Sequence, residues 1–164
     1  MHLDPLPRDT RAVTRYELLL FVHVLAAAAW FGAVVFVVLV TELALRSNDR
    51  NALLRLIEYD DRLAPILYIP AVILILTAGI GLVLDGPWSF GDGWVIAGLI
   101  LLVGIFIVGV GFILPAAKKV KAAVEASGVE STEARARLQT LRLITWLDLG
   151  LLIVAMFVMT TKPF

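Results

Sequence analysis

The sequence contains no cysteine, and only two of its 164 residues are histidine. Without cysteine the chain can form no disulfide, no iron–sulfur cluster and no zinc site with thiolate ligands. Its 14 basic and 14 acidic residues balance, so the chain lacks the positive field that attracts nucleic acid. It also has no phosphate-binding loop, no metal-cluster spacing and no pairing of a nucleophile with a base. We therefore expect no nucleic-acid partner and no metal centre, and we identify no catalytic residue.

Apolar residues are abundant instead. They make up 60% of the chain, with a mean hydropathy of +0.93, whereas a typical soluble protein has roughly 45–50%. Four stretches have the ~20 apolar residues needed to cross a hydrocarbon core of ~30 Å; they are residues 18–40, 64–84, 94–114 and 143–161. Backbone groups in lipid must bond within their own segment, so these spans are helices. The sequence predicts an all-α, polytopic membrane protein, an antiparallel four-transmembrane-helix bundle that forms a single domain over residues 1–164.

The first span has some features of a signal peptide, because Arg8, Arg11 and Arg15 precede it and Ala26–Ala29 offers small residues for cleavage. The apolar run continues to Val40, well past the length of a signal peptide. We therefore expect this helix to be retained.

Basic residues predict the orientation in the membrane. The two longer loops, about residues 41–63 and 115–142, contain ten of the 14 lysines and arginines. Loops rich in lysine and arginine stay in the cytoplasm, so we predict that both loops are cytoplasmic and both termini lie outside. The three arginines before the first span act against this orientation.

Both cytoplasmic loops are expected to be largely helical. Ser127-Gly128 should end one helix, and Ser131 or Thr132 should cap the next. We expect this helical hairpin to lie along the membrane surface, where its basic residues would meet anionic lipid. A docking site for a partner is the alternative.

Small residues indicate where membrane helices approach closely. We expect the bundle to pack on those of the first three spans, namely Ala28, Gly32, Gly79, Gly81, Gly98, Gly104, Gly109 and Gly111.

Two polar residues stand inside the predicted spans, where charge is costly and therefore informative. His23 lies five residues from the start of the first span, a depth of roughly 8 Å. Asp148 lies about as deep from the opposite end of the fourth. We expect Asp148 to be structural and to pair with Arg62, Arg142 or backbone donors of the loop. A proton relay is the alternative, which the lack of further carboxylates in the spans disfavours.

His23 has two interpretations. The first is a neutral histidine bonded to the backbone of a neighbouring helix or to water. The second is an axial ligand of haem b or, less favoured, a copper ligand. Met156, Met159 or His23 of a second copy would then supply the second ligand, and Trp30 would pack against the edge of the macrocycle. Each methionine is more often a packing residue.

Several short motifs carry a family resemblance: Leu20–Leu25, Trp30–Gly32, Leu63–Pro65, Leu114–Pro115 and Met159–Phe164. With them the chain resembles a bacterial family of predicted integral membrane proteins of unknown function. That family is related to the HemJ-type protoporphyrinogen oxidases and the CopD-type copper proteins. The resemblance implies a protein of the bacterial cytoplasmic membrane.

In the HemJ-type enzymes a histidine of the first helix ligates haem, and His23 matches that position. Those enzymes also have a lysine entering the third span and an Asn-Glu pair before the last. Here residues 93–97 contain no lysine, and in place of the Asn-Glu pair this chain reads Trp146-Leu147-Asp148. The CopD-type proteins imply copper handling, but this chain lacks clustered histidine and methionine.

We therefore expect an accessory or assembly subunit of a larger membrane complex, in contact with the lipid bilayer and another membrane protein or a second copy. A haem- or metal-linked redox protein centred on His23 is one alternative, and a small oligomeric transporter is another.

Overall fold

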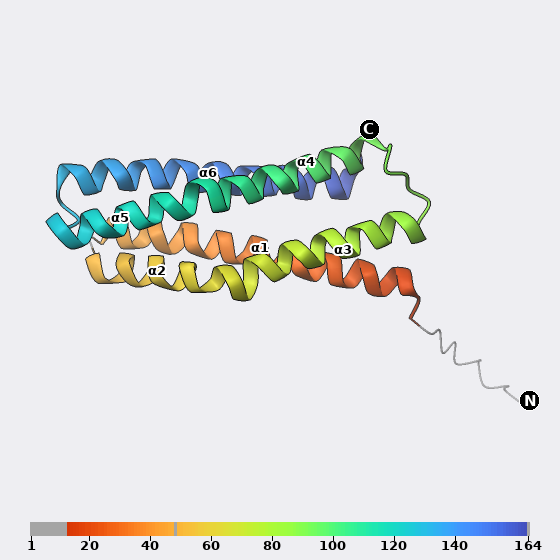
Figure 1. The fold of residues 1–164 in the computed structure, drawn as a ribbon, viewed down its shortest axis with the longest axis horizontal. Coiled ribbons are helices and arrows are strands. Elements are labelled where there is room, and N and C mark those ends of the chain that lie inside the picture. Colours follow the sequence, from red (N-terminus) through yellow and green to blue (C-terminus); the bar gives the residue numbers. More distant parts are fainter. Residues whose placement is uncertain (1–12, 48, 164) are drawn as a thin grey trace, which may run out of the picture.

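The described structure consists of four long helical rods. The computed structural model describes residues 13–47 and 49–163, and within these ranges it contains helices and no strand. In chain order the helices are α1 (Arg15–Arg46), α2 (Arg50–Leu63), the π-helical stretch η1 (Ala64–Tyr68), α3 (Ile69–Asp85), α4 (Gly93–Ile107), the π-helical stretch η2 (Val108–Ile113), α5 (Leu114–Ser127) and α6 (Thr132–Thr161). Stretch η1 joins α2 to α3, and η2 joins α4 to α5, so these six elements form two continuous rods (Figure 1).

The four rods run antiparallel (Figure 1). Each is long and apolar enough to cross a membrane, and each contains one of the spans expected from the sequence. The prediction of an all-α bundle of four transmembrane helices is confirmed. One end of the bundle holds the loop between α3 and α4, the start of α1 and the end of α6. We call the other end, with the connections α1–α2 and α5–α6, the loop side.

Two apolar clusters hold the bundle together. Helix α1 packs along α3, and α4 packs along α6. The first cluster lies within the spans and consists of Ala26, Trp30, Val34, Val38, Ala71, Ile105, Leu149 and Leu152. The second lies at the loop side and consists of Ala44, Leu53, Ile57, Val120, Ala123, Val124, Ala134, Leu138 and Leu141.

The second cluster shows how the loop helices pack. Helices α2 and α5 continue the spans in line and bury their apolar faces against each other and against α6. Their contact with the membrane surface stays a prediction. Helix α5 has 14 residues, so it extends the rod by about 21 Å. The loop side is therefore a packed extension of the bundle.

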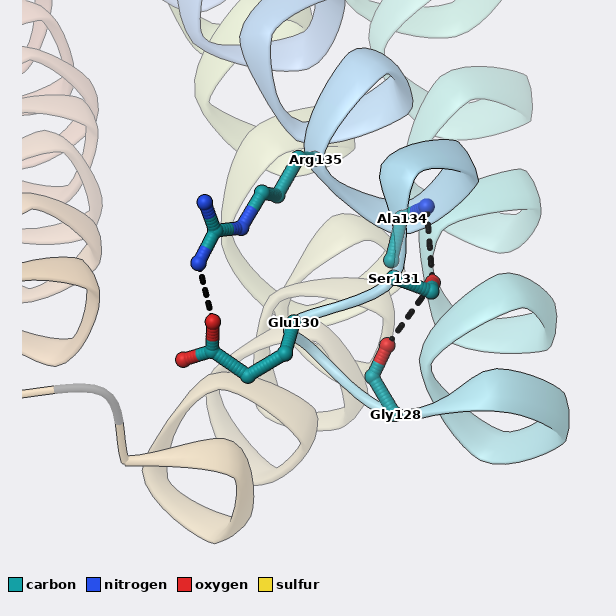
Figure 2. Close-up of polar contacts among 5 residues, drawn as sticks. All are labelled: Gly128, Glu130, Ser131, Ala134 and Arg135. Carbon is teal, nitrogen blue, oxygen red and sulfur yellow. Dashed lines mark hydrogen bonds and ion pairs between the residues drawn. The ribbon is translucent and has the colours of Figure 1, made fainter.

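The turn between α5 and α6 follows the predicted break and cap (Figure 2). Helix α5 ends at Gly128, whose φ of 78° suits glycine. The Ser131 hydroxyl accepts a hydrogen bond from the Ala134 amide at 3.2 Å and donates one to the Gly128 carbonyl at 3.0 Å. An ion pair between Arg135 and Glu130 spans the same turn (Figure 2). Of the two caps considered, Ser131 is the one used.

Only some of the small residues pack inside this chain. A Cβ on Gly98 would lie 1.7 Å from Met159 Cε, and one on Gly81 would lie 2.8 Å from Leu19 Cδ1, so both glycines make room for a neighbouring helix. In contrast, Ala28 and Gly32 are exposed on α1, and nothing lies within 4 Å of a Cβ on Gly32. The expectation that the Ala28–Gly32 pair packs the bundle is wrong for the single chain.

Candidate functional site

A cavity of about 430 Å³ lies between the helices on the loop-side half of the spans, and every element of the bundle contributes to its lining. Its walls are mainly apolar, with Val34, Val38, Val72 and Ile105 among the lining side chains. Exposed charged residues, including Lys118, line it toward the loop side. The volume falls within the range of small-molecule sites, about 300–1,000 Å³. We call it the central cavity.

Asp148, on α6, is the buried charged residue of the central cavity. Its side chain is only 4% exposed, and its Oδ1 atom has no hydrogen-bond partner among the residues that the structure describes. The basic partners expected from the sequence are engaged elsewhere, since Arg142 pairs with Glu42 and Arg62 pairs with Glu58. The expected pairing of Asp148 with either arginine is therefore wrong.

A second carboxylate and a hydroxyl line the same cavity. The Tyr68 hydroxyl, in η1, donates a hydrogen bond of 2.6 Å to Oδ1 of Asp60, in α2. Asp60, Tyr68 and Asp148 all line the central cavity. Of the five acidic side chains that line it, Asp148 is the buried one, and Asp60 is the one that accepts a hydrogen bond from the phenol.

Stretch η1 explains why Asp60 and Tyr68 meet. Residues eight apart on a regular α-helix point about 80° away from each other, at 100° per residue. A π-helical turn takes up one extra residue, so the pair behaves like residues seven apart, which point within about 20° of each other. Pro65 stands at the start of η1; proline lacks the N–H of a regular helix bond and disturbs the turn before it.

The second π-helical stretch contributes to the same cavity. Gly109, Val110 and Ile113 of η2 line it, opposite Ala64 and Tyr68 of η1. π-Helical turns are rare and often occur at functional sites. Both of them here border the central cavity, which makes it the candidate functional region of the fold.

Glu42 ties α1 to α6 at the border of the cavity. Its Oε1 accepts hydrogen bonds from Arg142 Nε and from the Trp146 indole, the latter at 3.1 Å. The Glu42 side chain is 14% exposed, so this ion pair is partly shielded from water. Arg142 is thereby held away from Asp148.

His23 lies in a different part of the bundle, between α1 and α3. Its Nδ1 is 2.9 Å from the carbonyl oxygen of Ile75. A carbonyl only accepts, so Nδ1 carries the proton and Nε2 has the lone pair. A Cβ on Gly79 would lie 3.2 Å from the imidazole, so this glycine makes the space that the ring occupies. The backbone bond corresponds to the first interpretation of His23.

The other residues proposed around His23 are not gathered there. Met159 packs against Gly98 of α4, and Met156 is 39% exposed. Trp30 is buried in the span cluster and also lines the central cavity. Within residues 13–47 and 49–163, no group of three or more histidine or acidic side chains is placed to hold a metal ion.

Sequence reasoning missed Asp60 and Tyr68. Asp60 was assigned to a loop and Tyr68 to an apolar span, so their contact was not expected. The available signal was Pro65 between them, because a proline within one continuous helix indicates a locally changed turn.

Comparison with known proteins gave one result. A family model described as "Predicted integral membrane protein (DUF2269)" matches residues 17–163. The searches of curated proteins and of solved structures found no match. The matched region includes His23, Asp60, Tyr68 and Asp148.

Proposed function

The chain belongs to the DUF2269 family of predicted integral membrane proteins, and we propose that it is an accessory subunit of a membrane complex that binds a small molecule in the central cavity. The observation that carries the proposal is the carboxyl group of Asp148, which lines the cavity with Oδ1 unpartnered in the described part of the chain. Burying a polar group without a partner costs about 1–3 kcal/mol. An ionisable residue inside a membrane is by default a functional site.

The proposed orientation places this cavity toward the cytoplasm. Ten of the 14 basic residues lie in the segments that form the loop side. By the positive-inside rule the loop side faces the cytoplasm of a bacterial cell, and both ends of the chain face outward. A ligand in the central cavity would then exchange with the cytoplasm or with the inner leaflet.

Access to the cavity is tested by thiol labelling, since the natural sequence contains no cysteine. We compare Asp148→Cys with Leu149→Cys. Both positions are buried, but only Asp148 lines the cavity. A small methanethiosulfonate reagent should modify the thiol at position 148 and leave that at 149 unmodified. Equal protection of both thiols would show that the cavity admits no small molecule and would refute the proposal.

The accessory role is supported by the outward face of α1. Ala28 and Gly32 are exposed there, and such a pair lets another membrane helix approach closely. The test compares Gly32→Leu with Gly150→Leu, since both glycines are exposed and have nothing within 4 Å of a Cβ. Gly32→Leu should abolish co-purification of another membrane protein, and Gly150→Leu should retain it. If the wild-type protein co-purifies only with a second copy of itself, the proposal of an accessory subunit gives way to that of a small oligomeric transporter.

A second candidate function is haem-linked redox chemistry at His23, as its resemblance to the HemJ-type enzymes implies. It is favoured by the bond from Nδ1 to Ile75, because ligating histidines commonly donate their other nitrogen to a carbonyl. Bound haem would supply electron-transfer chemistry. The fit is incomplete within one chain, since Met159 packs on Gly98, so the second ligand would be Met156 or His23 of a second copy.

Hemin titration tests this candidate. The Soret band should shift when hemin is added to wild type and should not shift with His23→Ala. Met159→Leu should behave as wild type, because its side chain packs against α4. No shift in wild type, or an equal shift in His23→Ala, would remove the candidate.

A further inference from the structure

We infer that the ligand of the central cavity is an amphiphilic organic cation, an alkylammonium group on an apolar body. This inference rests on the proposed function, because it names the ligand class of the same cavity. It is carried by three features of the cavity: the charge of its polar groups, the composition of its walls, and its opening toward lipid.

The negative charge inside the cavity favours a cationic ligand. Asp148 lines the cavity with a buried oxygen to which no described residue donates a hydrogen bond, and Asp60 lines the same cavity. The hydroxyl protons of Tyr68 and Thr145 are donated elsewhere, to Asp60 and to the Leu141 carbonyl. Arg142 is engaged by Glu42. An ammonium group would supply the missing donors and the opposite charge together.

Lys118 and Lys121 also line the cavity, and the alternative is that they neutralise its acids. The structure gives neither lysine an ion pair with Asp60 or Asp148, and Lys118 is exposed. They lie on α5, at the loop side, whereas Asp148 lies within the fourth span. The buried end of the cavity therefore holds Asp148 without a basic partner, whereas the loop-side end carries charges of both signs.

The walls exclude a bare metal ion as the natural ligand. Calcium takes six to eight oxygen ligands, and magnesium requires near-octahedral oxygen coordination. No group of three or more acidic or histidine side chains in the described ranges is placed to hold such an ion. Most of the wall is apolar, with valine, leucine and isoleucine as its commonest residues, and such a wall suits an alkyl body.

The cavity also opens between the helices on the membrane side. Ile69 of α3, Phe106 of α4 and Val110 of η2 line it, and their exposed fractions are 46%, 41% and 52%. Exposed apolar side chains at this level of a transmembrane bundle contact lipid chains. A ligand whose alkyl chain lies between α3 and η2 could place its ammonium group beside Asp148 without leaving the bilayer.

The test uses decylammonium as the probe, with decanol and decanoate as neutral and anionic analogues of the same length. Binding to purified full-length protein in maltoside micelles is measured by calorimetry and by the shift of the thermal unfolding midpoint. Decylammonium should bind and raise the midpoint, and the two analogues should do neither. Asp148→Asn should weaken binding about ten- to hundredfold, the equivalent of one charge-assisted hydrogen bond. Glu125→Gln removes an exposed acid outside the cavity and should bind as wild type.

The outcomes separate this inference from the proposed function. Equal binding of decanol, or unchanged decylammonium binding by Asp148→Asn, overturns the cation assignment while the cavity remains a ligand site. If no probe binds but the thiol at position 148 is labelled, the inference fails and the accessible cavity stands. Competition by added phosphatidylethanolamine would identify a lipid amine as the source. If phosphatidylethanolamine does not compete while decylammonium still binds, the source is a free amine. Both results uphold the ligand class.

Discussion

Replacing Asp148 with leucine should stabilise the ligand-free protein, although the residue is buried. The carboxyl group loses its hydration on folding and gains no donor at Oδ1 in the described structure. Leaving a buried polar group unpaired costs about 1–3 kcal/mol. Leucine removes this cost, and its extra methyl groups can extend into the cavity that Asp148 lines, so overpacking is avoided. We expect Asp148→Leu to raise the free energy of unfolding by about 1–3 kcal/mol.

Asp60→Leu is the matched control, because it makes the same substitution at the other carboxylate. Here the carboxylate accepts the Tyr68 hydroxyl, and its loss leaves that hydroxyl without its partner. The expected change is a destabilisation of about 1–3 kcal/mol. Both values can be measured by reversible unfolding with sodium dodecyl sulfate in mixed micelles. If Asp148→Leu proves as destabilising as Asp60→Leu, then Asp148 has a structural partner and the reasoning is refuted.

Two further predictions follow from the same geometry. Gly98→Val should destabilise the bundle by about 1–3 kcal/mol, because the new side chain would collide with Met159. Gly104→Ala has nothing within 4 Å of its Cβ, so it should leave stability unchanged or raise it by up to about 1 kcal/mol. Thermal unfolding of the two variants in the same detergent checks both. Reporter fusions after Gly91 should be active outside the cell, and fusions after Gly128 should be active in the cytoplasm, because the two points lie at opposite ends of the third rod. Activity of both fusions on the same side would contradict the four-span bundle.

An unpaired acid inside a membrane bundle is a feature that stability alone does not explain. Natural proteins keep such groups where function requires them, at the expense of stability. The two π-helical stretches support the same view, because both border the cavity that contains Asp148. The buried acid and the irregular parts of the helices thus lie at one cavity, which is the site of the proposed function.

The sequence was sufficient to predict the spans because hydrophobic runs of this length have one stable solution in lipid. It also predicted a cap at Ser131 or Thr132, of which Ser131 is used, since that signal is local. It did not predict the meeting of Asp60 and Tyr68, which depends on one π-helical turn that shifts the helical phase. Nor did it predict that Arg142 binds Glu42, because that choice is made between distant helices.

The same limit applies to small residues. Gly98 and Gly32 are equivalent in sequence terms, since each is a glycine within an apolar helix. Gly98 is buried under Met159, whereas Gly32 is exposed on the far side of α1. Which face of a uniformly apolar helix points inward is fixed by packing with its neighbours, and hydrophobic periodicity carries little of that information in a membrane.

The most direct test of the account is thiol protection in the cavity itself. Gly109→Cys places the only thiol of the chain on the cavity wall, where nothing lies within 4 Å of its Cβ. The account predicts that decylammonium slows modification of this thiol when Asp148 is present, and that about ten- to hundredfold more decylammonium is needed for the same protection when Asp148→Asn is combined with it. Equal modification rates with and without decylammonium in the Asp148 background would contradict a cation site in the central cavity.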